Sequence, residues 1–216
     1  MVLSGTGFML GTGGSALVAK ELGCGHREKA NRIFTMMIGF VVVVGLVLTV
    51  LGIAFIRPIA RLMGASESIM EDCVLYGRIV IAFNVAFMFQ NVFQSFLVAA
   101  EKPRLGLVAT VSAGVTNMVL DALLVGVFRW GLAGAALATG LSQTVGAVIP
   151  MVFFLNRENG SALHFSFTPM EAHPLLQACG NGASELMSNI SGSIAAMVYN
   201  FQLLKFLGED GVSAYG

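Results

Sequence analysis

One carboxylate interrupts an otherwise apolar stretch of this sequence. Asp121 lies within residues 105–128, a segment long enough to cross a bilayer, and Asn117 precedes it by four positions. A charged side chain at the centre of a bilayer costs from about 3 to more than 10 kcal/mol, depending on the reference state. Because residues four apart share one face of a helix, Asn117 and Asp121 predict a polar face that other parts of the protein must cover or solvate.

A second polar pair lies at a matching distance from the turn at residues 129–130, which joins two apolar segments. Asp121 lies eight positions before this turn and Thr139 lies nine positions after it. At a rise of about 1.5 Å per residue, both are about 12 Å from the turn. One helical turn further along, Asn117 matches Gln143. The two pairs therefore predict a polar pocket between neighbouring helices.

The oxygen atoms of these polar side chains could bind a small cation. Carboxylate, amide and hydroxyl oxygens are the ligands that Na⁺ requires, and the carboxylate of Asp121 could instead carry a proton. The alternative is that Asp121 is a structural hydrogen-bond partner between helices. Thr139 could likewise bond only to its own helix, as threonine often does. Carboxylates within membranes commonly mark ion pathways, which favours the functional reading of Asp121.

Further polar residues are candidates for lining a substrate cavity. Asn84, Asn91 and Gln94 lie within the preceding apolar segment, residues 74–100. We expect Asn84 to reach a depth similar to that of Asp121. A few amides among aromatic and methionine side chains suit lipophilic ligands, although they could equally join helices. Glu185 could be a second titratable site or an acid at the level of the lipid headgroups.

Enzyme chemistry has no support in the sequence. The three cysteines are scattered without C-x-x-C spacing, and the three histidines form no H-E-x-x-H motif. No paired nucleophile and base is seen. We expect no cofactor and no metal site other than the possible Na⁺ site at Asp121, Asn117 and Thr139. The formal net charge is zero, and no basic tract points to nucleic acid.

The amino-acid composition indicates that these residues are held by membrane-spanning helices. The 216 residues are 56% hydrophobic and 11% charged, whereas a soluble domain carries about 25% charged residues. No strand alternation is seen, so we expect an all-α, polytopic membrane protein. We expect Pro58 to end the second segment and Pro150 to kink the fifth. The expected spans are 2–19, 33–56, 74–100, 105–128, 131–155 and 178–204.

A polar connector divides the chain into three parts. Residues 1–155 hold five helices, residues 156–177 form the connector with two prolines, and residues 178–216 hold a truncated sixth helix. Lysine and arginine are more frequent in the connections after the first, third and fifth spans, which predicts that the connector is cytoplasmic. Because the chain begins within an apolar segment, we interpret it as a fragment of a longer transporter.

Three stretches resemble the multidrug and toxic compound extrusion (MATE) family, in its prokaryotic branch. They are GGSALVAKELG at 13–23, NMVLD at 117–121, and GLAGAALAT at 131–139 followed by Ser142 and Gln143. The resemblance implies a bacterial plasma-membrane protein of twelve helices in two six-helix lobes, which exports drugs by alternating access. This chain would supply helices two to six, so that its first lobe is incomplete, then the inter-lobe connector and helix seven.

The resemblance also implies roles for particular residues. An asparagine and an aspartate of helix five and a threonine of helix six contribute to the family's cation site, and they fall on Asn117, Asp121 and Thr139. A further aspartate of that site belongs to helix one, which this chain lacks. The acid that some members carry in helix seven could match Glu185, although the local register differs.

These observations predict an antiporter that exchanges amphiphilic or cationic organic compounds for Na⁺ or H⁺. Its expected partners are the lipid bilayer, such substrates, helix one and the second lobe. One alternative is a flippase of lipid-linked saccharides or cell-wall precursors, which tends to have a basic central cavity. Another is that the truncated fragment is inert by itself.

Overall fold

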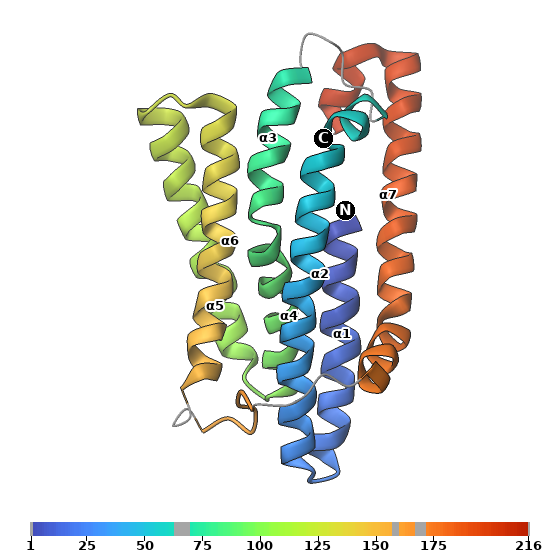
Figure 1. Cartoon of the computed structure of the whole chain (residues 1–216). Coiled ribbons are helices and arrows are strands. Elements are labelled where there is room, and N and C mark those ends of the chain that lie inside the picture. Colours follow the sequence, from blue (N-terminus) through green and yellow to red (C-terminus); the bar gives the residue numbers. More distant parts are fainter. Residues whose placement is uncertain (1, 63–69, 157–159, 167–171, 216) are drawn as a thin grey trace.

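The computed structural model describes residues 2–62, 70–156, 160–166 and 172–215, and all regular structure within them is helical (Figure 1). The expected all-α fold is therefore confirmed. The elements are α1 (Val2–Gly23), α2 (Arg27–Leu62), α3 (Met70–Ala82), α4 (Asn84–Ala99), α5 (Pro103–Asp121), the π-helix η1 (Ala122–Val127), α6 (Gly131–Leu155) and α7 (Ala172–Tyr215).

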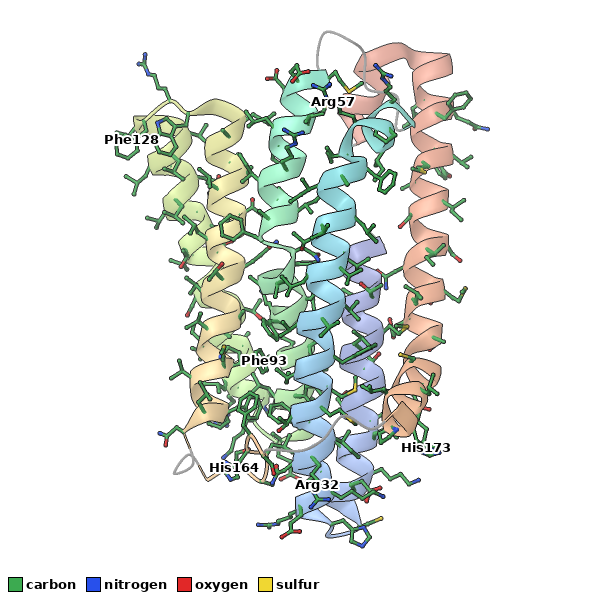
Figure 2. All side chains as sticks on the ribbon, viewed as in Figure 1. Arg32, Arg57, Phe93, Phe128, His164 and His173 are labelled. Atoms are coloured by element: carbon green, nitrogen blue, oxygen red, sulfur yellow. The ribbon has the colours of Figure 1, made fainter. Side chains whose placement is uncertain are left out.

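The helices run along one common axis, with α5 and α6 on one side of the bundle and α7 on the other (Figure 1). Helix α4 is central, since it contacts α1, α2, α5 and α6. The charged residue Arg32 and the histidines His164 and His173 lie toward one end of the bundle, and Arg57 lies toward the other (Figure 2). The middle of the bundle is mostly apolar, as a membrane-spanning bundle requires.

Length and composition qualify three helices in the described part of the chain as membrane spans: α2, α5 continued by η1, and α6. The pair α3 and α4 qualifies as a fourth span if it is counted as one bent helix. The expected spans 2–19 and 178–204 correspond to α1 and α7, which do not meet this test. Glycine, serine and asparagine lower their hydropathy, and the two helices pack closely against each other.

The expected span 105–128 is found as the span Pro103–Val127, whose last six residues form the π-helix η1. Two other expectations are wrong. The segment 74–100 is not one continuous helix, because α3 and α4 meet at Phe83 with a bend of 48°. Pro58 does not end α2, which extends to Leu62. An interior proline removes one backbone hydrogen bond, and neighbouring groups in a membrane protein can compensate for that loss.

An aromatic core joins the connector to the bundle. The ring of Phe34 meets those of Phe96, Phe154 and Phe165, with centroids 4.9–5.1 Å apart. Leu163 is fully buried in the same cluster. Residues 160–166, which we call the strap, therefore pack onto α2.

Two backbone hydrogen bonds fix the strap in register on α2. The N–H of His164 donates to Oδ1 of Asn31 at 2.8 Å, and the N–H of Ser166 donates to Oγ1 of Thr35 at 2.9 Å. Asn31 and Thr35 are four residues apart and so share one face of α2. This part of the polar connector is thus an ordered element rather than a free linker.

Candidate functional site

Helix α5 carries Asn117 and Asp121 in its last turns. Pro103 begins the helix, where its missing N–H costs no helical hydrogen bond. The side chains of Asn117 and Asp121 are half-buried, whereas Met118 and Val119 between them are exposed. The apolar residues therefore face outward, and the two polar groups lie at the edge of the packed face.

Helix α6 brings Thr139 to the same depth. A Cβ atom at Gly134 would lie 3.1 Å from the carbonyl oxygen of Leu124, so the antiparallel helices touch at this point. Extending that register by five residues along each helix places Thr139 opposite Val119. Val119 is midway between Asn117 and Asp121, so this count from the Gly134 contact gives the same level for the two polar groups and Thr139 as the count from the turn.

Both polar faces turn toward α4. Thr110, seven residues before Asn117, donates a hydrogen bond from Oγ1 to Oε1 of Gln94 at 3.0 Å. Gly146, seven residues after Thr139, lies so close to Gln90 that an added Cβ would be 2.8 Å from its Cδ. Seven residues are nearly two complete helical turns, so each pair shares one face of its helix.

Side-chain oxygens in this region have lone pairs available to bind a hard cation. Among the described residues, no hydrogen bond or ion pair reaches the side chains of Asn117, Asp121 or Gln143. The hydroxyl of Thr139 donates to the carbonyl of Ala135 at 3.0 Å, which leaves its oxygen lone pairs free to accept. The described residues contain no cluster of three or more His, Cys, Asp and Glu side chains that could hold a transition metal.

The structure does not bring the remaining candidates to this site. Asn84 is 2% exposed and its Nδ2 donates to the carbonyl of Gly45 in α2 at 3.3 Å. Its Oδ1 is buried without a partner among the described residues. Asn91 donates from Nδ2 to the carbonyl of Phe87 in its own helix at 3.0 Å. Glu185 is exposed on α7.

Gln90 and Gly140 are residues that the sequence reasoning did not assign to the site. Gln90 precedes Gln94 by one helical turn, and this spacing in the sequence could have placed the two amides on one face of the helix. Gly140 follows Thr139 and is buried. Its importance depends on contact with a residue 57 positions earlier in the chain, Phe83, which no local pattern reveals.

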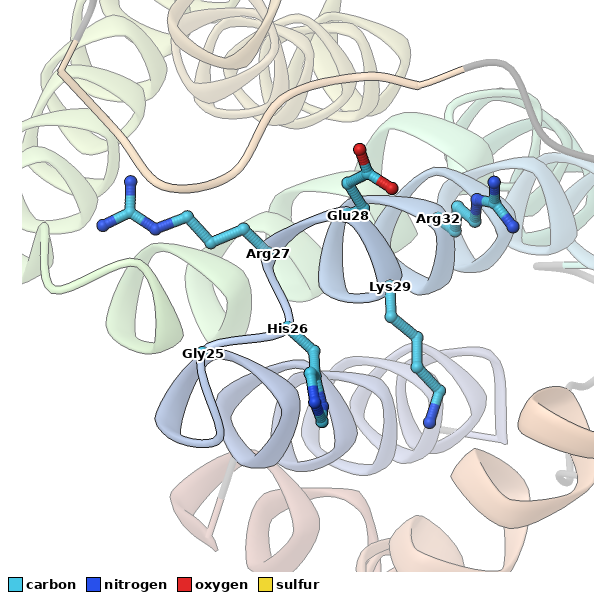
Figure 3. Close-up of a pocket in the computed structure, with 6 residues that line it drawn as sticks. All are labelled: Gly25, His26, Arg27, Glu28, Lys29 and Arg32. Carbon is cyan, nitrogen blue, oxygen red and sulfur yellow. The ribbon is translucent and has the colours of Figure 1, made fainter.

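A separate hollow of about 600 Å³ lies at the turn between α1 and α2 (Figure 3). Figure 3 shows Arg27 and Lys29 pointing in different directions, so the cations do not converge on one point. Glu21 accepts hydrogen bonds from Lys29 at 2.7 Å and His26 at 3.1 Å. The bond from Lys29, with that from His26, holds the pKa of Glu21 below its ordinary value. The hollow is lined by Gly25, His26, Arg27, Glu28, Lys29 and Arg32.

Comparison with known proteins gives one consistent family. The model of the MatE family matches residues 1–123. The Multidrug export protein MepA of Staphylococcus saprophyticus is 21% identical over 215 residues, which cover 100% of this chain and 48% of that protein. The Probable multidrug resistance protein YoeA of Bacillus subtilis is 27% identical over 219 residues, which cover 96% of this chain and 46% of that protein.

A solved structure is similar over the whole chain. It shows the inward-facing conformation of a multidrug resistance MATE family transporter of the MOP superfamily. Its TM-score is 0.90 at 25% sequence identity, with 100% of this chain and 49% of that chain covered. The chain thus spans about half the length of the relatives it matches.

Proposed function

The chain belongs to the MatE family, a family of membrane transporters rather than enzymes, and from this premise we propose that it forms about half of a secondary antiporter. The complete transporter exports drugs or other amphiphilic organic compounds in exchange for Na⁺ or H⁺. Its other half consists of a helix that precedes α1 and of the rest of a second lobe that begins with α7. We place it in the bacterial plasma membrane, with the turn between α1 and α2 on the cytoplasmic side.

One observation carries this proposal. Asn117 and Asp121 of α5 and Thr139 of α6 belong to helices that touch at Leu124 and Gly134, and both helices contact α4 through residues seven positions from Asn117 and from Thr139. Asp121 supplies the negative charge, and the amide of Asn117 and the hydroxyl of Thr139 supply neutral oxygens. A cation or proton that binds here neutralises a carboxylate that is unfavourable in an apolar surrounding.

Coupling requires that the cation and the substrate favour different conformations of the transporter. A ligand shifts a conformational equilibrium only by its difference in affinity for the two states. With Asp121 neutralised, the lobe is stable in a conformation that closes the polar pocket. With Asp121 ionised, the pocket stays hydrated and open to an incoming substrate.

The distribution of positive charge favours organic cations and amphiphiles over anionic lipid-linked saccharides. Every lysine and arginine whose side chain the structure describes is exposed. A flippase of pyrophosphate-linked precursors needs cations inside its cavity to bind the phosphates. Between Arg104 and Leu155, α5, η1 and α6 carry no lysine or arginine, and Arg129 lies in the turn between them.

The test is to replace Asp121 by asparagine in the transporter that contains this chain. We expect Asp121→Asn to abolish efflux of a fluorescent drug driven by a Na⁺ or pH gradient in proteoliposomes, because the amide cannot ionise. Asp72→Asn is the matched control, since Asp72 is exposed in the first turn of α3. Gradient-driven efflux that survives in Asp121→Asn at the rate of the control would refute the proposal.

A further inference from the structure

The bend between α3 and α4 lies beside the proposed cation site. Phe83 is the residue at the bend, with φ −90° and ψ 7°, and its N–H donates to the carbonyl of Val80 at 3.2 Å. This tight turn ends α3 and lets α4 begin in a direction that differs by 48°. The bend needs neither proline nor glycine, so a contact elsewhere in the protein must select it.

The ring of Phe83 lies directly on the backbone of α6. The Cγ, Cδ2 and Cε2 atoms of the ring occupy the space that a Cβ atom at Gly140 would need. Gly140 is buried, and only glycine permits so close an approach of a ring to a helix backbone. Thr139 is the adjacent residue, so the ring fixes the part of α6 that carries the proposed cation ligand.

Helix α2 holds the bend from the opposite side. Asn84, next to Phe83, donates to the carbonyl of Gly45, and Oγ1 of Thr49 lies 3.4 Å from the carbonyl oxygen of Ile81. The residues on both sides of Phe83 are thus attached to α2. These contacts hold the backbone on both sides of Phe83, from which the ring reaches Gly140.

We propose that Phe83 is a positioning residue for the cation site, which acts by holding α6 at Gly140 so that Thr139 faces the pocket shared with Asn117 and Asp121. This inference rests on the proposed function of that site. Ligands must be held within about 0.5 Å of their productive positions for tight binding, so a shift of α6 at Gly140 larger than this would weaken cation binding. The bend therefore sets the affinity for the coupling cation, and it transmits movement of α2 and α3 to the cation site.

The experiment is a double-mutant cycle in the complete transporter, reconstituted in proteoliposomes. Gly140→Ala places a methyl group against the ring, and Phe83→Ala removes the ring. Each single variant should raise the cation concentration at half-maximal efflux about tenfold, with the KM for the drug changed less than about threefold. The double variant should show about the loss of Phe83→Ala alone and not the sum of the two losses, since the alanine methyl group then has room. Additive losses would indicate general damage and not a direct contact between the two residues.

Gly14→Ala is the control for a methyl group added at a buried helix contact, because a Cβ atom at Gly14 of α1 would lie 2.9 Å from Cε of Met37. It should leave the cation requirement unchanged. If Gly140→Ala does not fold, Phe83→Leu and Phe83→Ala carry the test. An unchanged cation requirement in the Phe83 variants, or equal effects of Gly140→Ala and Gly14→Ala, would overturn the inference.

Thr139→Val and Asp121→Asn are measured in parallel to separate the two claims. If both lose cation dependence while the Phe83 and Gly140 variants behave as wild type, the inference fails and the proposed function stands. If both retain cation dependence, the proposed cation site fails and the inference fails with it.

Discussion

Asp121 shows how an apolar helix can hold a carboxylate. The face of α5 that includes Thr110 and Asn117 turns toward the amides of α4, whereas Met118 is 72% exposed and suits contact with lipid. Small residues permit this packing, because the buried positions of α5 are Gly106, Ala109 and Ala113. Helices in membranes approach closely where such small side chains meet. The polar groups Asn117 and Asp121 thereby lie half-buried at the edge of the packed face of α5.

At the residue scale, the pKa of Glu21 depends mainly on the hydrogen bond from Lys29. Lys29→Gln should raise the pKa of Glu21 toward its ordinary value, because the bond from Lys29 is the main cause of the lowered pKa. A carboxyl whose pKa is lowered in the folded state stabilises that state above its ordinary pKa. This stabilisation is lost as the pH falls through the lowered value. NMR titration of the Glu21 carboxyl carbon measures the shift.

Lys20→Gln is the control for this titration. Lys20 neighbours Glu21 in sequence, and the hydrogen bonds to the Glu21 carboxylate come from Lys29 and His26. We expect the titration curve of Glu21 in Lys20→Gln to match that of Glu21 in the wild type. A Glu21 pKa that is identical in wild type and Lys29→Gln would contradict the assignment.

At the element scale, the strap at residues 160–166 links α6 to the remainder of the connector. Asn31→Leu combined with Thr35→Val should release it from α2, because both side-chain acceptors for its backbone N–H groups are lost. A spin label at Ala162, in a background without the three native cysteines, should become more mobile. Buried Leu163 and the ring of Phe165 continue to hold part of the strap, so we expect local loosening and not unfolding.

Thr116→Val serves as the control for the strap, since the Thr116 hydroxyl donates to the carbonyl of Ser112 in its own helix at 2.7 Å. The spin-label spectrum should be unaffected by this change. If the double variant gives the same spectrum as Thr116→Val, the two hydrogen bonds do not hold the strap.

At the scale of the whole molecule, α1 and α7 form the contact between the two proposed lobes. Gly182 of α7 lies against the carbonyl of Met9, and Gly13 of α1 lies against the carbonyl of Ala178. Gly182→Leu should separate the helices, because the leucine side chain would occupy the space of the Met9 backbone. Gly180→Leu should not, because nothing lies within 4 Å of a Cβ atom at Gly180.

Disulfide formation between introduced cysteines measures this separation. A Cβ atom at Gly5 would lie 3.1 Å from that of Asn189, so the pair Gly5→Cys and Asn189→Cys should cross-link after a small adjustment. The cross-linking yield should fall with Gly182→Leu and persist with Gly180→Leu. Equal yields in the two variants would show that the glycine contact does not hold α7 on α1.

The sequence by itself determined the helical class and the approximate positions of the helices. These follow from a local rule: an apolar segment in a bilayer must satisfy its backbone within a helix. The rise of about 1.5 Å per residue of an α-helix also predicts one level for Asp121 and Thr139 on either side of the turn at residues 129–130. The sequence did not predict that residues 122–127 form a π-helix.

Only the tertiary structure decided how these helices bend and which faces they share. The bend at Phe83 depends on Gly140 and on Asn84 bonded to Gly45, and the position of the strap depends on Asn31 and Thr35. Each of these contacts joins residues at least 39 positions apart. Their energies arise from packing and from buried hydrogen bonds that exist only once the bundle has assembled, so a local pattern of residue types does not contain them.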